Sequence, residues 1–313
     1  MMLVKAVLVA VVSLVAAVLL QARSLADLAP YESPISGVGL PPMAIFRAAT
    51  KVSAMVDRLS FALKPPPVQL MSLVNGYQIT QGMGAFARLN IAQAIEKTAS
   101  GGMADVFDIA KATGTDVEAL RRFLRWMSIF GVVSSDGTPE AARFGNTALS
   151  KLTIKDAPGS LWGAAVVSSD DHYSGWSNID ASLRKGAGTI AFDDKHGMAI
   201  WDYYTKHPEK EAAFASFMTG LSLDQDAAVA MSGANFTECG AIVDVGGGHG
   251  SLMGEVVAAF PTLEGKATVV DLPSVVTTAP SRKGVSFTGG DFFESKTIPS
   301  SAKTNCYIEK VRS

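Results

Sequence analysis

The sequence predicts an α/β protein in which a helical, winged-helix-like part precedes a Rossmann-like, doubly wound domain. Three observations support this fold class. Apolar runs that end in acidic residues alternate with a helical segment over 241–293, a helix–turn–helix–ribbon pattern spans 102–137, and the stretch 157–226 has a helical composition. With 48 % hydrophobic and 18 % charged side chains among 313 residues, the chain can build a sizeable core, which excludes wholesale disorder.

The first 26 residues are a separate segment. Residues 6–20 follow Lys5, are apolar except for Ser13, and precede Ser24-Leu25-Ala26. This run is shorter than the roughly 20 residues that cross a bilayer, and it fits a signal peptide. An uncleaved signal anchor and a buried helix are the alternatives. We therefore expect a location in the secretory pathway or membrane anchoring through segment 1–26, with an organelle address also compatible.

Segment 27–67 is predicted to be a linker with one short helix. Prolines and glycines interrupt residues 30–42, and a helix is expected over 43–63. Pro65, Pro66 and Pro67 then stop that helix.

A winged-helix-like domain is assigned to 68–156. Val106, Ile109 and Ala110 suit the buried side of a short helix. A capping box at 115–118 is expected to begin the next helix, with the Thr115 hydroxyl and the Glu118 carboxylate satisfying its free N–H groups. A ribbon follows around the turn signal at 134–137.

Three arginines lie on the second of these helices, Arg121, Arg122 and Arg125, where a DNA-binding module would need them. The formal net charge of −2 provides no basic field, so we expect no nucleic-acid partner. Surplus apolar surface around Trp126 favours a partner helix instead. The following region, 157–236, is rich in aromatic residues and is expected to connect the domains and line a substrate pocket.

The chemical signal lies between residues 241 and 293. Residues 241–245 read as a buried parallel strand that ends in the glycine-rich loop 246–250. A helix over 252–260 and a second strand over 267–270, ending in Asp271, complete a βαβ unit. Ligands bind at the carboxyl ends of such strands, where this loop lies.

Two ligands fit a glycine loop of this kind. The dinucleotide fingerprint GxGxxG fails, because its third glycine would fall on Ser251 or Met253. Asp271 does not discriminate, since an acid there can hold a ribose diol in either case. S-adenosylmethionine (SAM) fits better because it has no phosphate, and glycines let the backbone approach its methionyl and ribose parts.

A third motif supports SAM. A strand around Phe287 is followed by Gly290-Asp291-Phe292-Phe293, where Asp291 can accept hydrogen bonds from an adenine amino group and Phe292 can cover the base. Asp244, Asp271 and Asp291 thus stand at three successive strand ends.

These motifs resemble the SAM-dependent O-methyltransferases of the caffeic acid, hydroxyindole and hydroxyneurosporene type. The resemblance covers roughly residues 70–310 and includes the arginine-bearing helix and the segment 201–218. It implies a homodimer with a winged-helix dimerisation domain, and a SAM-binding domain over 237–313 that is C-terminally incomplete. It also implies methylation of a hydroxyl on a small phenolic, indolic or polyketide-like acceptor.

The resemblance also assigns site residues. It implies that SAM is contacted by Asp244, Gly246, Gly247, Gly248, Gly250, Asp271, Asp291, Phe292 and Lys310. The acceptor ring would be held by Trp201, Phe214 and Met218. No metal site is expected, because neither the two cysteines nor the four histidines have metal-ligand spacing.

No catalytic base is assigned. Removing the proton of a phenol at neutral pH benefits from a base, which the family supplies as a histidine about four residues beyond Lys310. The sequence given ends at Ser313. Three alternatives follow: a fragment of an active enzyme, a shortened inactive paralogue that still binds SAM or dimerises, or another base. A nicotinamide-dependent oxidoreductase is the less favoured reading.

Overall fold

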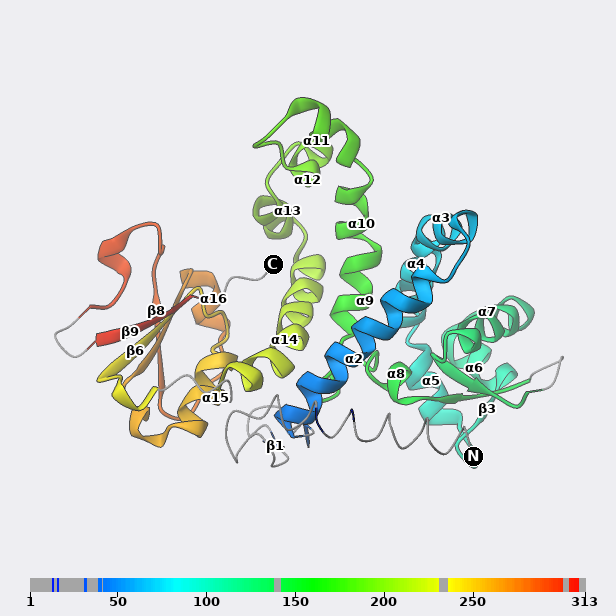
Figure 1. Ribbon diagram of the computed structural model, residues 1–313, viewed down its shortest axis with the longest axis horizontal. Coiled ribbons are helices and arrows are strands. Elements are labelled where there is room, and N and C mark those ends of the chain that lie inside the picture. The colour runs from blue at the N-terminus through cyan, green and yellow to red at the C-terminus, as the bar shows by residue number, and fades with distance from the viewer. Residues whose placement is uncertain are drawn as a thin grey trace. The chain divides into compact units, whose positions relative to one another are not determined.

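The computed structural model describes residues 42–137, 142–230, 236–300 and 304–309, together with Ser13, Ala16 and two short strands, β1 (Tyr31–Glu32) and β2 (Gly39–Leu40), which pair antiparallel. The described residues divide into two compact units. One is Pro66–Leu221. The other contains helix α2 (Met43–Ala62) and the C-terminal sheet (Figure 1).

The first unit begins with helices α3 (Pro66–Val74), α4 (Gly76–Arg88) and α5 (Ile91–Thr98). The proline run expected to act only as a stop also opens α3, because proline is pre-organised for the first helical position. Strand β3 (Ala104–Asp105), helices α6 (Val106–Thr113) and α7 (Val117–Ile129), and strands β4 (Val133–Ser135) and β5 (Arg143–Asn146) follow, before the short helix α8 (Ala148–Lys151). The strands form an antiparallel sheet in the order β3-β5-β4, which is the predicted helix–turn–helix–ribbon.

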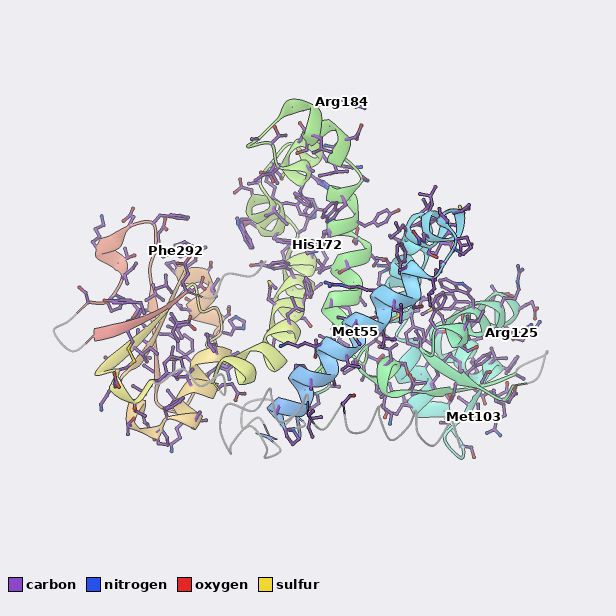
Figure 2. The ribbon with its side chains drawn as sticks, in the orientation of Figure 1. Met55, Met103, Arg125, His172, Arg184 and Phe292 are labelled. Atoms are coloured by element: carbon purple, nitrogen blue, oxygen red, sulfur yellow. A yellow bond between two sulfur atoms is a disulfide. The ribbon has the colours of Figure 1, made fainter. Side chains whose placement is uncertain are left out.

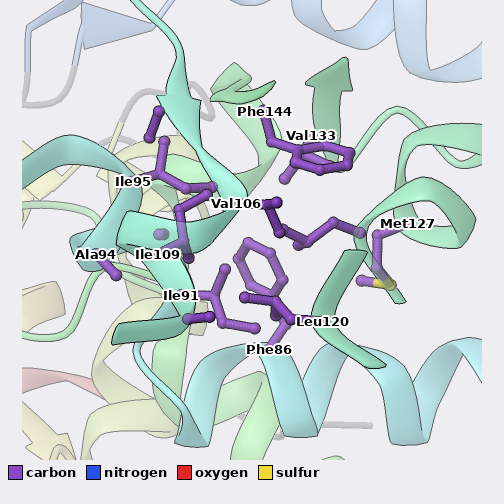
Figure 3. Close-up of a cluster of buried hydrophobic side chains, with 14 of the residues drawn as sticks. Phe86, Ile91, Ala94, Ile95, Val106, Ile109, Leu120, Met127, Val133 and Phe144 are labelled. Atoms are coloured by element: carbon purple, nitrogen blue, oxygen red, sulfur yellow. The ribbon is translucent and has the colours of Figure 1, made fainter. Parts of the chain in front are cut away.

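One buried cluster holds this part together (Figure 3). It brings Phe86 of α4, Ile91 of α5, Ile109 of α6, Leu124 of α7 and Phe144 of β5 to 0 % exposure. Burying each such side chain contributes about 1.5–3 kcal/mol, so the 3.6-residue spacing of apolar positions on these helices determines which faces meet.

The predicted cap of α7 was placed one residue too early. The side chain of Asp116, not Thr115, accepts the helix N–H of Ala119 at 2.8 Å. The Thr115 hydroxyl instead bonds the Thr113 hydroxyl at 2.9 Å. Asp and Thr are both good N-cap residues, and in this turn Thr115 has a nearer partner at the end of α6.

The second half of this unit is formed by α9 (Trp162–Ser169), α10 (Asp171–Trp176), α11 (Ile179–Lys185), α12 (Ala191–His196), α13 (Ile200–Lys206) and the first part of α14 (Pro208–Ala230), which leaves the unit after Leu221. Helix α9 packs on α4, where Gly84 lies against the Ser169 side chain. Arg88 donates to the Ser169 hydroxyl at 2.7 Å, and Gln81 donates to the Ser169 carbonyl at 2.8 Å. These bonds fix the aromatic helices to the winged-helix part.

The C-terminal unit contains the predicted parallel sheet. Its strands are β6 (Ala241–Val245), β7 (Ala267–Asp271), β8 (Val285–Gly289) and β9 (Thr304–Glu309), all parallel in the order β8-β7-β6-β9. Helix α15 (Ser251–Ala259) follows β6 and α16 (Pro273–Thr278) follows β7. Leu252, Met253 and Val256 of α15 pack against Ile242 and Val269 of the sheet.

A disulfide joins the two cysteines of the chain, which the sequence analysis gave no role. Cys239 and Cys306 have Cα atoms 5.6 Å apart and are 67 positions apart in the sequence. The register places Cys306 of β9 opposite Ile242 of β6. The bridge therefore ties the entry of the central strand β6 to β9.

The predicted location in the secretory pathway or at a membrane is corrected. Among the described residues, no helix is long and apolar enough to cross a membrane; even the 20-residue helix α2 carries Lys51, Asp57 and Arg58. Segment 1–26, on which the prediction rested, lies outside the described residues apart from Ser13 and Ala16.

Candidate functional site

Three sequence motifs meet at the carboxyl ends of β6, β7 and β8. The N–H of Gly246 donates to the Val270 carbonyl at 2.8 Å, and the N–H of Gly290 donates to the Asp271 carbonyl at 2.9 Å. Asp271 itself pairs in register with Gly289. Parallel strands end at the same edge of a sheet, so the glycine loop, Asp271 and Asp291 are brought side by side.

The Asp271 carboxylate connects two of these motifs. Its Oδ2 accepts the N–H of Gly248 at 2.7 Å, and its Oδ1 accepts the N–H of Leu272 at 2.7 Å. An ionised carboxylate offers about four acceptor positions. Asp271 therefore holds the loop and keeps acceptor capacity for hydroxyl donors of a ligand.

The glycine loop lies against its support so closely that side chains are excluded. Gly250 has φ +69°, and a Cβ there would lie 2.8 Å from the ring of Phe287. A Cβ on Gly247 would meet the Asp244 carboxylate. Asp244, one of the residues predicted to contact SAM, is only 1 % exposed and lies beneath the loop. Asp271 stands at the rim of the site.

Asp291 and Phe292 lie beyond the end of β8. The Asp291 Oδ1 accepts the N–H of Phe293 at 2.9 Å, and the Phe292 ring lies 3.8 Å from the position of a Cβ on Gly246. Phe292 is labelled in Figure 2. An open pocket of ≈ 540 Å³ adjoins it, lined by Val245, Phe292, Ile298, Ser300, Tyr307, Ile308 and Glu309. Cavities of this size accept small-molecule ligands; Lys310 lies outside the described residues.

The predicted acceptor residues belong to the other unit. The ring centroids of Trp201 and Phe214 lie 5.6 Å apart, nearly edge to face, and Tyr204 stacks on Phe214 with ring centroids 4.9 Å apart. Met218 lies one turn further along α14 and is half-buried. The structure thus brings Trp201 and Phe214 together on α13 and α14.

His172, which the sequence places beside the expected pocket segment without assigning it a catalytic role, lies in this cluster. Its ring lies 5.7 Å from Phe217 and 6.4 Å from Phe214 (Figure 2). Burial lowers the pKa of His172, and the neighbouring Asp171 opposes the shift. The imidazole is therefore held towards its neutral form, in which one ring nitrogen accepts a proton. Its place near the pocket segment is visible in the sequence, whereas its ring contacts depend on the packing of α10 near α14.

A buried ion pair fixes the same helices. Lys210 of α14 donates to Asp170 and to Asp171, each at 2.7 Å, and Asp171 is 3 % exposed. Burial acts to lower the pKa of Lys210, but the hydrogen bonds to the two carboxylates raise it above its usual value. Burial has the opposite effect on Tyr204 and raises its pKa; the Tyr204 hydroxyl has no hydrogen-bond partner in the described structure.

Comparisons with known proteins agree with both parts of the fold. A model described as an O-methyltransferase domain matches residues 176–308, and one described as an O-methyltransferase dimerisation domain matches residues 71–156. Phenazine O-methyltransferase PhzM of Lysobacter antibioticus is 27 % identical over 72 % of this chain and 64 % of its own. Acetylserotonin O-methyltransferase 1 of Oryza sativa subsp. japonica is 30 % identical over 62 % of this chain and 56 % of its own. The chain thus spans about six-tenths of the length of these relatives.

Solved structures show the same architecture. Human N-acetylserotonin methyltransferase in complex with SAM matches with a TM-score of 0.67 at 19 % identity, over 79 % of this chain and 71 % of that one. The mitomycin 7-O-methyltransferase MmcR matches with a TM-score of 0.64 at 25 % identity, over 83 % of this chain and 72 % of that one. None of these similarities supports the nicotinamide-dependent alternative.

Proposed function

Because the chain belongs to the O-methyltransferase family, we propose that it binds SAM at the carboxyl ends of β6, β7 and β8 and transfers a methyl group to a hydroxyl of a small aromatic or polyketide-like molecule. One observation carries the proposal. The glycine loop, Asp271 and Asp291 are separated by up to 45 positions in the sequence, yet backbone hydrogen bonds from Gly246 to Val270 and from Gly290 to Asp271 hold these segments at one sheet edge.

The residues at this edge fit SAM. The loop offers a ligand only backbone atoms at Gly247 and Gly250, because their close contacts with Asp244 and Phe287 leave no room for side chains. It also carries no lysine or arginine that a phosphate would favour. Asp271 has acceptor capacity for a ribose diol, while Asp291 and Phe292 suit an adenine amino group and its ring face. Bound SAM supplies an activated methyl group on a sulfonium, so the residues of the chain contribute mainly by holding it in position.

The acceptor side of the proposal rests on the aromatic cluster. Trp201, Phe214 and Met218 offer apolar area for a flat ring, and edge-to-face pairs such as Trp201 with Phe214 are a favoured arrangement. The relatives named for phenazine, acetylserotonin and mitomycin indicate the class of acceptor. His172 is a candidate proton acceptor near this cluster.

We also propose the domain boundaries 68–156 for dimerisation, 157–236 for the connecting and pocket region, and 237–313 for SAM binding. A homodimer through the dimerisation domain follows from its match at 71–156. Helix α3 supports this, because its apolar side chains Val68, Leu70, Met71, Leu73 and Val74 are all exposed in the single chain, which is typical of a surface that a partner covers.

Three measurements on the purified chain test the proposal. Isothermal titration should show SAM binding, light scattering should give twice the chain mass, and labelled methyl from SAM should appear on members of a phenol panel. SAM binding and dimer formation without transfer would support the inactive SAM-binding paralogue. A chain that binds neither SAM nor its own copy would overturn the proposal.

A further inference from the structure

We infer that Arg282 is a positioning residue that orders the glycine loop for the methionyl half of SAM. The inference rests on the proposed SAM site and adds a residue that no motif in the sequence singles out. Arg282 lies in the turn between α16 and β8, 33 positions from the loop, and its Nε donates to the His249 carbonyl at 2.7 Å.

The loop is held from two sides at neighbouring residues. The Asp271 carboxylate accepts the N–H of Gly248 at 2.7 Å, and the Arg282 guanidinium binds the carbonyl of the next residue, His249. An acidic side chain at the end of β7 therefore binds an N–H of the loop, while a basic side chain just before β8 binds the carbonyl of the next residue. Hydrogen bonds with one charged partner are roughly twice as strong as neutral ones.

These two hydrogen bonds matter because the glycines of the loop give its backbone much conformational freedom. Gly246, Gly248 and Gly250 all adopt positive φ, at +71°, +58° and +69°. Glycine visits positive and negative φ with similar ease and loses more freedom on ordering than any other residue. A ligand that binds this backbone must have it ordered, and ordering before binding raises affinity.

The site distinguishes the two halves of the ligand. The adenosine half is assigned to Asp271, Asp291 and Phe292. The amino-acid half is assigned to the loop. Losing the Arg282 bond should therefore weaken SAM while leaving 5′-methylthioadenosine, which lacks the amino-acid part, almost unaffected.

The chain offers a matched set of variants. In Arg282→Gln the amide nitrogen occupies the same place along the side chain as Nε, so an N–H donor remains although the charge is lost. Arg282→Met removes both the donor and the charge with a similar length. Lys283→Met is the neighbouring control, since the Lys283 side chain is 86 % exposed.

Titration calorimetry with both ligands gives the test. We expect the Kd for SAM to rise about tenfold in Arg282→Met, which corresponds to about 1.4 kcal/mol, with less than a threefold rise in Arg282→Gln and none in Lys283→Met. The Kd for 5′-methylthioadenosine should stay within twofold in all three. Hydrogen exchange of peptides covering 246–250, without ligand, should accelerate in Arg282→Met alone.

Two results would overturn the inference. Equal losses for both ligands would show that Arg282 supports the fold and not the loop, and unchanged loop exchange in Arg282→Met would show that its bond does not order the loop. If the unaltered chain bound neither ligand, the proposed function would fail, whereas the exchange measurement would still decide whether Arg282 orders the loop.

Discussion

Opening the Cys239–Cys306 bridge should destabilise the sheet unit by about 4 kcal/mol. The perturbation is made in two ways, by a dithiol reductant such as dithiothreitol and by the double variant Cys239→Ala/Cys306→Ala. Both act on the same link between the entry of β6 and the edge strand of the described sheet, β9.

The magnitude comes from the size of the closed loop. Cysteines 67 positions apart enclose β6, β7 and β8 with the helices α15 and α16, so the bridge restricts nearly the whole parallel sheet in the unfolded chain. The chain-entropy relation gives about 3 kcal/mol for a 15-residue loop and about 4.7 kcal/mol for 100 residues, which places this loop at about 4.4 kcal/mol. Domains have total stabilities of about 5–15 kcal/mol, so the loss is a large share.

The assay is urea unfolding followed by two signals. All four tryptophans, at positions 126, 162, 176 and 201, belong to the unit Pro66–Leu221, so tryptophan fluorescence reports that unit and serves as an internal control. Far-UV circular dichroism also reports the sheet. With a urea slope of about 2 kcal/mol/M, the sheet transition should move about 2 M lower on reduction while the fluorescence midpoint stays.

Two controls make the reasoning refutable. Dithiothreitol should have no effect on the double alanine variant, because no bridge remains to reduce. Native-state thiol labelling of the oxidised chain should find no free thiol. A loss of stability of less than about 0.5 kcal/mol on reduction would refute the loop-entropy account. Two free thiols in the untreated protein would refute the bridge on which that account rests.

Three further changes have expected results. Gly250→Ala forces a Cβ into a positive-φ position against a ring and should lower sheet stability by about 1–3 kcal/mol in urea unfolding by circular dichroism; an unchanged midpoint would contradict the loop geometry. Lys210→Met leaves the buried Asp171 carboxylate without its cation and should cost about 3–5 kcal/mol by tryptophan fluorescence, against less than about 0.5 kcal/mol for the control Lys206→Met. The lowered pKa of His172 means that the unfolded chain binds more protons just below about pH 6.5, so stability should fall as the pH drops from 7.5 through the folded pKa. His172→Phe should flatten that fall, and an identical slope in the variant would show that another group causes it.

The central strands could be predicted because their signal is local. Strand β6 occupies Ala241–Val245 as expected, since a strand buried on both faces reads as a continuous apolar run. The acids in the last residues of β6 and β7 and just after β8, together with the glycines after β6, then placed the candidate site at one sheet edge. Helix boundaries in 157–226 were not predicted, because α9 to α13 are each eight residues or shorter and share one aromatic-rich composition.

The features that escaped prediction depend on contacts between distant residues. The cysteine bridge follows from the register of β9 on β6, which no periodicity encodes. Arg282 reaches the loop across 33 positions, and His172 meets Phe217 only because α10 packs near α14. The cap of α7 failed for a local reason: two competent N-cap residues, Thr115 and Asp116, stand side by side.

The most direct test of the whole account is SAM titration of the variant Asp271→Ala/Asp291→Ala beside the control Glu294→Gln, an exposed acid three positions further on. Hydrogen bonds to charged groups are each worth about 1.5–3 kcal/mol, so losing both carboxylates should weaken SAM by about a hundredfold or more, while the control stays within twofold. Superimposable titration curves for the double variant and the unaltered chain would show that SAM does not bind at the ends of β7 and β8.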